Sequence, residues 1–197
     1  MTKTSPMSKQ SWYNILPVAA GSTCAEILLY GPVGGYDFEE DKWIDGKTFV
    51  QDLQALPDAV DEIHLRINSP GGSVVEGHAI FNAFDRHPAR VITHNDGLAA
   101  SMGSVLAMVG EEVHMAANAV LMVHKPSAGI MGNADDMRSA AERLDMFEGL
   151  LIAAYQRHSH LSEADLIALV AAETWLTAAE ALEAGFITHI EDAVEAA

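Results

Sequence analysis

The strongest constraint on the fold is a repeated pattern in which a short apolar run ends at a turn of small or polar residues. The run at 63–67 leads into a Pro-Gly-Gly turn, and the run at 91–93 is followed by GLAASMG at 97–103. A third run, 120–123, is followed by His124, Lys125 and then Pro126, and a proline cannot continue a paired strand. Such runs, alternating with amphipathic segments, are typical of an α/β fold with a mostly parallel sheet. The segments that follow the strands then meet at one edge of the sheet.

Helical periodicity fills the intervals between these strands. Residues that can cap a first turn indicate the helix starts, and proline or glycine indicates the ends. The predicted helices run from Asp45 to Pro57, from Val74 to Pro88, from Ala134 to about His158, from Ser162 onward, and from Thr177 to Gly185. Further short strands are expected at 12–18, at 25–30 and from Phe186 onward.

The composition is that of one globular domain. Of the 197 residues 49% are hydrophobic and 20% are charged, so a single domain with an ample core is expected over residues 12–197. Residues 1–11 are polar and are expected to form a mobile N-terminal segment. The lone cysteine, Cys24, excludes an intramolecular disulfide and fits a reducing compartment. Because no apolar run approaches the about 20 residues that span a bilayer, we expect a cytoplasmic protein.

The charge balance limits the classes of partner. With 28 acidic and 11 basic residues, the formal net charge is −17, and the basic residues form no cluster in the sequence. Nucleic acids and anionic membranes attract basic patches. Binding to nucleic acid or to a membrane is therefore not expected.

Ser101 lies where a turn leads into an apolar helix start. Unpaired N–H groups and the helix dipole stabilise negative charge there, so a serine suits a nucleophile, although from this stretch alone an N-cap is the preferred interpretation. Two other segments of the sequence favour a catalytic role for Ser101 over an N-cap. The glycines of the Pro-Gly-Gly turn expose N–H groups that a carbonyl oxygen could approach, and His124 ends a strand. A nucleophile, oxyanion donors and a general base are the parts that acyl transfer requires.

Four sequence blocks resemble the consecutive signatures of one enzyme family. INSPGGSV, DGLAASMGS, LMVHKP and ETWLTAAEALEAGFI are similar to blocks of the Clp protease proteolytic subunit (ClpP) family, within a match from about Ile27 to Ile187. GLAAS, GNADDM and above all ETWLTAAEA are most similar to its phage-encoded branch, the prohead or head-maturation proteases. The resemblance implies a ClpP/crotonase-like superhelix of ββα units with a protruding handle helix in the region of about 125–160.

The resemblance also assigns roles to residues of the site. It implies that Ser101 is the nucleophile, that His124 is the general base, and that the backbone N–H groups of Gly72 and Met102 form the oxyanion hole. The third triad member of the family is usually Asp, and Glu173 stands at the matching position. Without the resemblance, Glu173 would be interpreted as a solvated surface carboxylate. Two rival carboxylates for this role are Asp165 and Asp192.

Substrate and partner surfaces follow from the same resemblance. Gly71 and the segment Gly129, Ile130 and Met131 are expected to bind substrate, the segment by pairing with a peptide as an added strand. The long helix has more apolar surface, around Met146, Leu150 and Leu151, than one contact face needs. We therefore expect a homo-oligomer, with rings stacked through this helix as in the family.

The predicted function is an ATP-independent serine endopeptidase that cleaves phage head proteins (scaffold, portal or capsid precursors) during head maturation, in the host cytoplasm or inside the assembling head. Three alternatives stay open: a housekeeping ClpP-type peptidase that works with an AAA+ unfoldase, a crotonase-fold acyl-CoA enzyme, and an inactive ring-forming subunit.

No cofactor or metal is expected from the sequence. His158 and His160 lie two residues apart without the HExxH pattern or a Cys/His spacing. Core or surface roles are expected for the histidines that fall in or beside predicted strands and helices, namely His64, His78, His87, His94 and His114.

Overall fold

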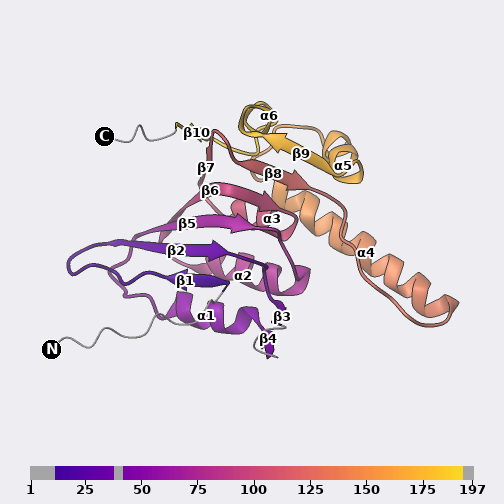
Figure 1. The fold of residues 1–197 in the computed structure, drawn as a ribbon, viewed down its shortest axis with the longest axis horizontal. Helices are drawn as coiled ribbons and strands as arrows, with labels where there is room; N and C mark the ends of the chain where they lie inside the picture. The colour runs from indigo at the N-terminus through magenta and orange to yellow at the C-terminus, as the bar shows by residue number, and fades with distance from the viewer. Residues whose placement is uncertain (1–11, 38–41, 193–197) are drawn as a thin grey trace.

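A computed structural model describes residues 12–37 and 42–192, so the predicted N-terminal segment 1–11 lies outside the described residues. Within these ranges eight strands form one sheet and β3 and β4 form a separate pair (Figure 1). The strands are β1 (Tyr13–Ile15), β2 (Cys24–Tyr30), β3 (Gly35–Asp37), β4 (Lys42–Ile44), β5 (Glu62–Ser69), β6 (Arg90–Ala100), β7 (Glu112–Ala116), β8 (Val120–Val123), β9 (Thr174–Thr177) and β10 (His189–Glu191). The helices are α1 (Gly46–Gln54), α2 (Val74–Arg86), α3 (Met102–Ala107), α4 (Ala134–Tyr155), α5 (Glu163–Ala171) and α6 (Ala178–Glu183).

The sheet is mostly parallel, as the sequence predicts. Strands β2, β5, β6, β7 and β10 follow one another in parallel register, and β1 adds an antiparallel edge. Strand β6 is longer than expected. Residues 97–100, predicted to belong to a turn, continue the strand because their backbone pairs with β8, with Leu98 opposite Val120. The turn is thus confined to Ser101, and β9 adds antiparallel to β8.

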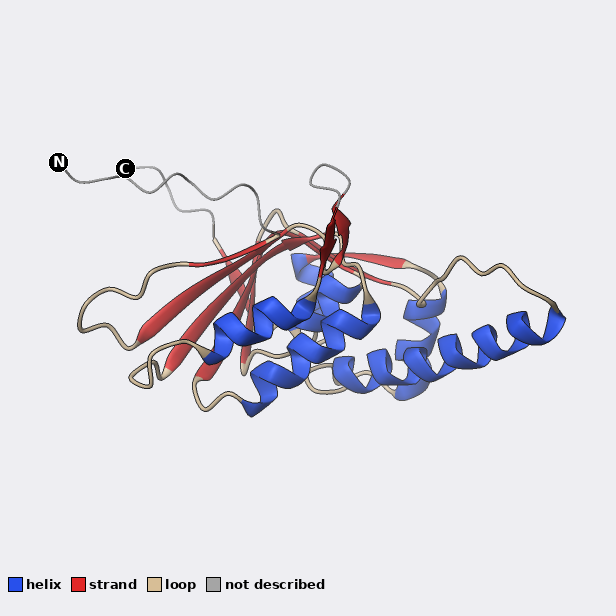
Figure 2. Ribbon diagram, turned by 90° about the horizontal axis from the view of Figure 1, so that it is seen from below, coloured by secondary structure: helices blue, strands red, loops and turns tan. Residues whose placement is uncertain are grey.

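Alternation along the strands separates a buried face from an outer face. In β5, Ile63, Leu65 and Ile67 are fully buried, whereas the residues between them are partly exposed. Seen edge-on, the helices lie on one side of the sheet only (Figure 2). The hydrophobic core therefore lies between the sheet and the helices, and the other face of the sheet is left to polar side chains.

Helix capping agrees with the sequence at most ends. Asp45 and Ser162 cap α1 and α5, and Thr177 and Glu180 form a full capping box at α6. Two predictions in the last third were wrong. The link between α5 and α6 contains strand β9, which pairs with β8, and Phe186–Ile187 does not begin a strand but packs into the core ahead of β10.

Helix α4 projects from the body as the predicted handle (Figure 1). Its buried residues lie mainly at the C-terminal root, where Leu151, Ile152 and Tyr155 join the core. The remainder extends into solvent, so the prediction of an α/β fold with a protruding helix is confirmed. None of the helices in the described part of the chain is long and apolar enough to cross a membrane.

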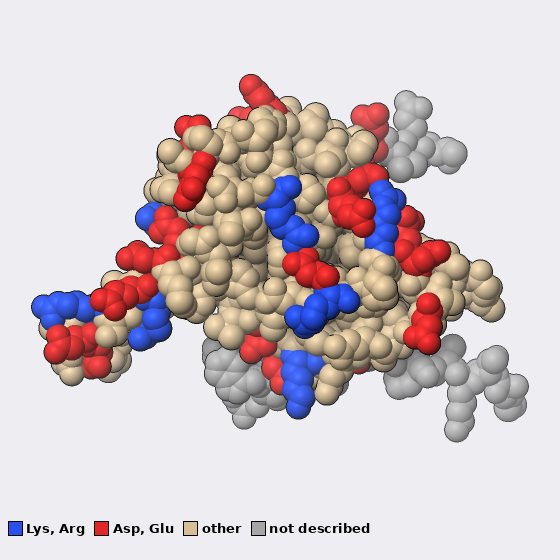
Figure 3. Space-filling model, turned by 180° about the vertical axis from the view of Figure 1, so that it is seen from behind, with Lys and Arg blue, Asp and Glu red and all other residues tan. Residues whose placement is uncertain are grey.

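Charged side chains of both signs are interspersed on the helix-covered face of the molecule (Figure 3). An example is Arg157 on this side of the core, whose guanidinium lies 2.7 Å from Asp85 and 5.0 Å above the ring of Phe81. On this face, positive charge is therefore locally balanced by carboxylates.

Candidate active site

Ser101 joins the end of β6 to the start of α3 in a backbone conformation that side chains rarely adopt, with φ 53° and ψ −124°. Its N–H donates to the carbonyl of Met122, 2.9 Å away, which ties the turn to β8. The Ser101 hydroxyl makes no N-cap hydrogen bond. The interpretation of Ser101 as a simple helix cap is therefore wrong.

His124 meets this hydroxyl from the neighbouring strand. Because β8 pairs in parallel with the second half of β6, the residue after β8 lies beside the residue after β6. The distance between His124 Nε2 and Ser101 Oγ is 2.8 Å. If the hydroxyl donates to Nε2, the proton of the neutral imidazole is on Nδ1. This is the arrangement in which histidine can remove a proton from serine.

The glycine turn packs directly against Ser101. A Cβ at Gly71 would lie 2.6 Å from Ser101 Cβ, and one at Gly72 would lie 2.3 Å from the carbonyl oxygen of Val33. Both glycines have positive φ, 89° and 151°. The turn therefore requires glycine for space and for conformation.

Two backbone N–H groups near the Ser101 turn have no hydrogen-bond acceptor among the described residues. Val33 N donates to Gly71 O at 2.7 Å and Ser73 N donates to Val33 O at 2.8 Å, which leaves the N–H of Gly72 without an acceptor among the described residues. Met102 is the first residue of α3, so its N–H has no acceptor within the helix. The structure thus brings the four residues Ser101, His124, Gly72 and Met102 together.

Glu173 is near the site but is not joined to it by a hydrogen bond. The antiparallel register of β8 and β9 pairs Val123 with Thr174, so the next pair along is His124 and Glu173. Glu173 is exposed, and no hydrogen bond within the described ranges connects its carboxylate to His124. Glu173 also has a positive φ, 51°, just after α5.

The two rival carboxylates lie elsewhere. Asp165 is in the first turn of α5, at the opposite end of that helix from Glu173, where the Ser162 hydroxyl donates to it at 2.6 Å. Asp192 follows β10, which pairs with β7 rather than with β8 or β9. The strand register therefore favours Glu173 over both rivals as the carboxylate opposite His124.

The predicted substrate segment is a solvent-exposed connection between β8 and α4. Gly129 has open space around its Cα, Ile130 is 41% exposed and Met131 is 98% exposed. The segment forms no strand in this structure, so its backbone is available for pairing. Of the predicted substrate-binding residues, only Gly71 touches the Ser101 turn.

A buried hydrogen-bond chain behind Ser101 escaped sequence analysis. Ser104 Oγ lies 2.6 Å from the carbonyl oxygen of Ser101 and 2.8 Å from the hydroxyl of Tyr155. Tyr155 is fully buried at the root of α4, and burial raises its pKa well above the ordinary value. In the sequence Tyr155 only continues the apolar stripe of the long helix, so nothing signals that its hydroxyl reaches the Ser101 turn.

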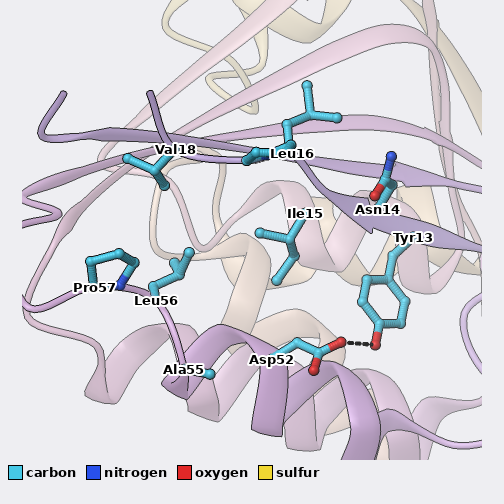
Figure 4. Close-up of a pocket in the computed structure, with 10 residues that line it drawn as sticks. Tyr13, Asn14, Ile15, Leu16, Val18, Asp52, Ala55, Leu56 and Pro57 are labelled. Carbon is cyan, nitrogen blue, oxygen red and sulfur yellow. Dashed lines mark hydrogen bonds between the residues drawn. The ribbon is translucent and has the colours of Figure 1, made fainter. Parts of the chain in front are cut away.

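A hollow of about 510 Å³ lies away from this site, between β1 and α1 (Figure 4). Most of the residues that line it are aliphatic or proline, and the Tyr13 hydroxyl donates to Asp52 across it at 2.6 Å. Its described lining residues include no serine, cysteine or histidine.

Comparison with known proteins agrees with this geometry. A protein-family model described as Clp protease matches residues 39–194. The ATP-dependent Clp protease proteolytic subunit 2 of Nocardia farcinica is 39% identical over 140 residues, covering 70% of this chain and 69% of that protein. Subunit 1 of Mycobacterium tuberculosis is 35% identical, covering 70% of each chain, and subunit 1 of Leifsonia xyli is 33% identical, covering 71% of this chain and 72% of that protein.

Proposed function

The chain belongs to the Clp protease family and is a serine peptidase, and we propose that Ser101 is its nucleophile and His124 its general base. The observation that carries the proposal is the 2.8 Å contact between His124 Nε2 and Ser101 Oγ at the start of α3. Membership in a peptidase family disfavours the acyl-CoA enzyme, and the complete nucleophile–base pair disfavours the inactive subunit.

In the proposed reaction, His124 Nε2 takes the hydroxyl proton while Ser101 Oγ attacks the carbonyl carbon of a peptide bond. The N–H groups of Gly72 and Met102 donate to the oxyanion that forms. The intermediate collapses as Nε2–H protonates the leaving amine, which leaves an acyl-enzyme. Water, deprotonated by the same imidazole, then releases the acid and regenerates Ser101.

Glu173 is proposed as the carboxylate that accepts a hydrogen bond from His124 Nδ1. Its place opposite His124 in the continued register supports this role. A rotation of its exposed side chain towards the imidazole would complete the triad, and the carboxylate would then stabilise the imidazolium that forms during attack. The extra methylene of Glu, relative to Asp, provides reach for this rotation.

Substrates are proposed to be unfolded polypeptides. The relatives reported above are named proteolytic subunits of ATP-dependent Clp proteases, which supports a housekeeping peptidase that receives chains from an AAA+ unfoldase in the cytoplasm. The exposed backbone at 129–131 supports binding of a peptide as an added strand beside the Ser101 turn.

Cleavage of phage head proteins is the second candidate. It is favoured by the similarity of GLAAS, GNADDM and ETWLTAAEA to the head-maturation branch. The names of the reported relatives favour the Clp subunit over this candidate. Degradation of an unfolded reporter protein that depends on an added AAA+ unfoldase would support the first candidate. Site-specific cleavage of a capsid or scaffold precursor without ATP would support the second.

The nucleophile is tested by covalent labelling. A fluorophosphonate probe should label the wild-type chain once, and Ser101→Ala should abolish both labelling and peptide hydrolysis, because it removes only the attacking hydroxyl. Circular dichroism should show the same secondary structure in both. The variant Ser139→Ala, which changes an exposed serine of α4, serves as the matched control, and it should still be labelled. Labelling that survives in Ser101→Ala would assign the nucleophile to another serine.

A further inference from the structure

Four histidines from adjacent strands form a row on the outer face of the sheet. They are His64 on β5, His94 on β6, His114 on β7 and His189 on β10, and neighbouring ring centroids are 5.1, 5.0 and 4.6 Å apart. The strand register places His94 opposite His114 and His114 opposite His189. Ser101 is seven residues beyond His94, or about 23 Å along an extended strand, so the row is separate from the candidate active site.

The centre of the row is a carboxylate shared by two rings. Glu191 Oε1 lies 2.7 Å from His94 Nδ1 and 3.2 Å from His114 Nδ1. One ligand atom from each of these three residues lies within 4.8 Å of the other two. The side chains of His94, His114 and Glu191 are 8%, 21% and 33% exposed, so the centre is sheltered but open to solvent.

The outer nitrogen of each of these rings also has a partner. His114 Nε2 lies 3.0 Å from Glu112 Oε2, and His94 Nε2 lies 2.8 Å from His64 Nδ1. The chain continues from His64 Nε2 to Glu62 Oε1 at 3.1 Å. The second oxygen of Glu62 and that of Glu112 both accept from Arg90, which holds the two carboxylates in place.

The number of protons available to the hydrogen bonds of this cluster indicates whether it is complete without a metal ion. The contacts just described are five, and each needs one proton or another cation between its two atoms. Three neutral imidazoles supply three protons. The cluster therefore needs either two additional protons, making adjacent imidazolium ions, or one divalent cation.

We propose that the cluster binds a divalent transition-metal ion such as Zn²⁺ through His94 Nδ1, His114 Nδ1 and the Glu191 carboxylate. Such an ion replaces the two protons on the nitrogens that face Glu191. The remaining three protons are then one for each ring: His114 Nε2–H donates to Glu112, His94 Nε2–H to His64, and His64 Nε2–H to Glu62. Every imidazole is neutral, and every contact is satisfied.

The geometry and the surroundings fit this ion. Two nitrogens and one carboxylate oxygen are a common zinc ligand set. At bond lengths of about 2.0–2.1 Å tetrahedral ligand atoms lie about 3.3 Å apart, and the two distances from Glu191 Oε1, 2.7 and 3.2 Å, are close to this value. A carboxylate behind a ligating histidine, as Glu112 is behind His114, orients the ring. The nearby cation Arg66 is paired with Asp96 at 2.5 Å.

The proposal is independent of the peptidase assignment and is tested by metal binding alone. The full chain, stripped with a chelator and desalted, is titrated with CoCl₂ and then with ZnCl₂ in competition. We expect one Co²⁺ per chain, with the visible absorption of four-coordinate cobalt, and its loss on addition of Zn²⁺. The variants His114→Gln and Glu191→Gln should abolish this uptake. Glu112→Gln should weaken it about 10–100-fold, because it removes the hydrogen bond that orients a ligand.

Control variants separate this site from its neighbours. His87→Gln, at the C-terminus of α2, should bind cobalt as the wild type does. His124→Gln should also bind it, and loss of uptake in this variant would instead place the ion at the Ser101 turn. His189→Gln tests the adjacent group of Glu112, His114 and His189. Uptake lost in His189→Gln but kept in Glu191→Gln would overturn the ligand assignment. Absence of any spectral change in the wild type with excess Co²⁺ would overturn the metal site in favour of the imidazolium pair.

Discussion

Among the described residues other than glycine, Ser101 and Glu173 alone have a positive φ. This conformation costs an L-residue roughly 1–3 kcal/mol, and surrounding structure must hold it. Glycine would adopt it without strain. Both strained residues flank His124, one hydrogen-bonded to it and one opposite it in the strand register. Glu173 follows the C-cap of α5, where helices commonly end in a left-handed residue that is usually glycine. Helix termination therefore accounts for the backbone conformation, and it is the glutamate in place of glycine that favours a role for the side chain.

That argument predicts opposite effects on stability and activity at one position. Glu173→Gly should raise the free energy of unfolding by up to about 1 kcal/mol, because the strain is relieved. It should nevertheless reduce kcat by roughly 10²–10⁴, as should Glu173→Gln, because neither variant has a carboxylate at this position to stabilise the His124 imidazolium. Glu173→Asp should reduce kcat by less than Glu173→Gln does, because it keeps a carboxylate but with a shorter reach. Thermal unfolding and peptide hydrolysis measure the two effects.

Asp165→Asn is the matched control, since this carboxylate lies at the other end of α5. It should leave kcat unchanged. If Glu173→Gln kept full activity and either Asp165→Asn or Asp192→Asn lost it, the orienting role would belong to the aspartate whose variant lost activity.

At the scale of elements, apolar runs and capping residues, which are local signals in the sequence, predicted several strands and helix starts correctly. Strand β8 coincides with the predicted apolar run 120–123, and the caps at Asp45 and Thr177 begin helices as expected. Strand β9 was missed because four residues between two capped helices resemble a link, and only pairing with β8 makes them a strand. Phe186–Ile187 was misassigned because apolar residues can fill the core without joining a ladder.

The candidate site shows the same division. Ser101, His124 and the glycine turn follow predicted strands, so their convergence could be predicted from a parallel sheet. The histidine row could not, because β5, β6, β7 and β10 are brought together by strand register across long intervals of sequence. The link from Tyr155 to Ser104 is likewise a tertiary contact, joining α4 to α3.

Tyr155→Phe tests whether the root of α4 positions the Ser101 turn. The variant removes one of the two hydrogen-bond partners of Ser104, the other being the Ser101 carbonyl, which should lower the free energy of unfolding by about 0.5–1.5 kcal/mol. If the hydrogen-bond chain positions Ser101, kcat should also fall while KM stays near the wild-type value.

Tyr13→Phe provides the comparison, because it removes a 2.6 Å hydrogen bond to Asp52 between β1 and α1, far from Ser101. It should reduce stability without changing kcat. Equal kcat values for Tyr155→Phe and Tyr13→Phe would limit Tyr155 to a structural role.

At the scale of the whole molecule, the exposed apolar side chains of α4 indicate a contact with a second chain. Met137, Met146 and Leu150 are 52%, 57% and 47% exposed on a helix that projects from the body. Leu151, which the sequence also suggested for this surface, is instead buried at the root. Exposed apolar side chains on a projecting helix are more stable when another subunit covers them.

We therefore expect the chain to sediment as a homo-oligomer at micromolar concentration. The double variant Met146→Lys/Leu150→Lys should dissociate it or lower its order, because it places two charges in the proposed contact, while the far-UV spectrum stays unchanged. Val75→Lys is the control, since Val75 is 63% exposed on α2 and outside the handle. It should not affect assembly. A stable wild-type monomer would remove the argument from α4, whereas dissociation by Val75→Lys alone would move the interface to the body of the domain.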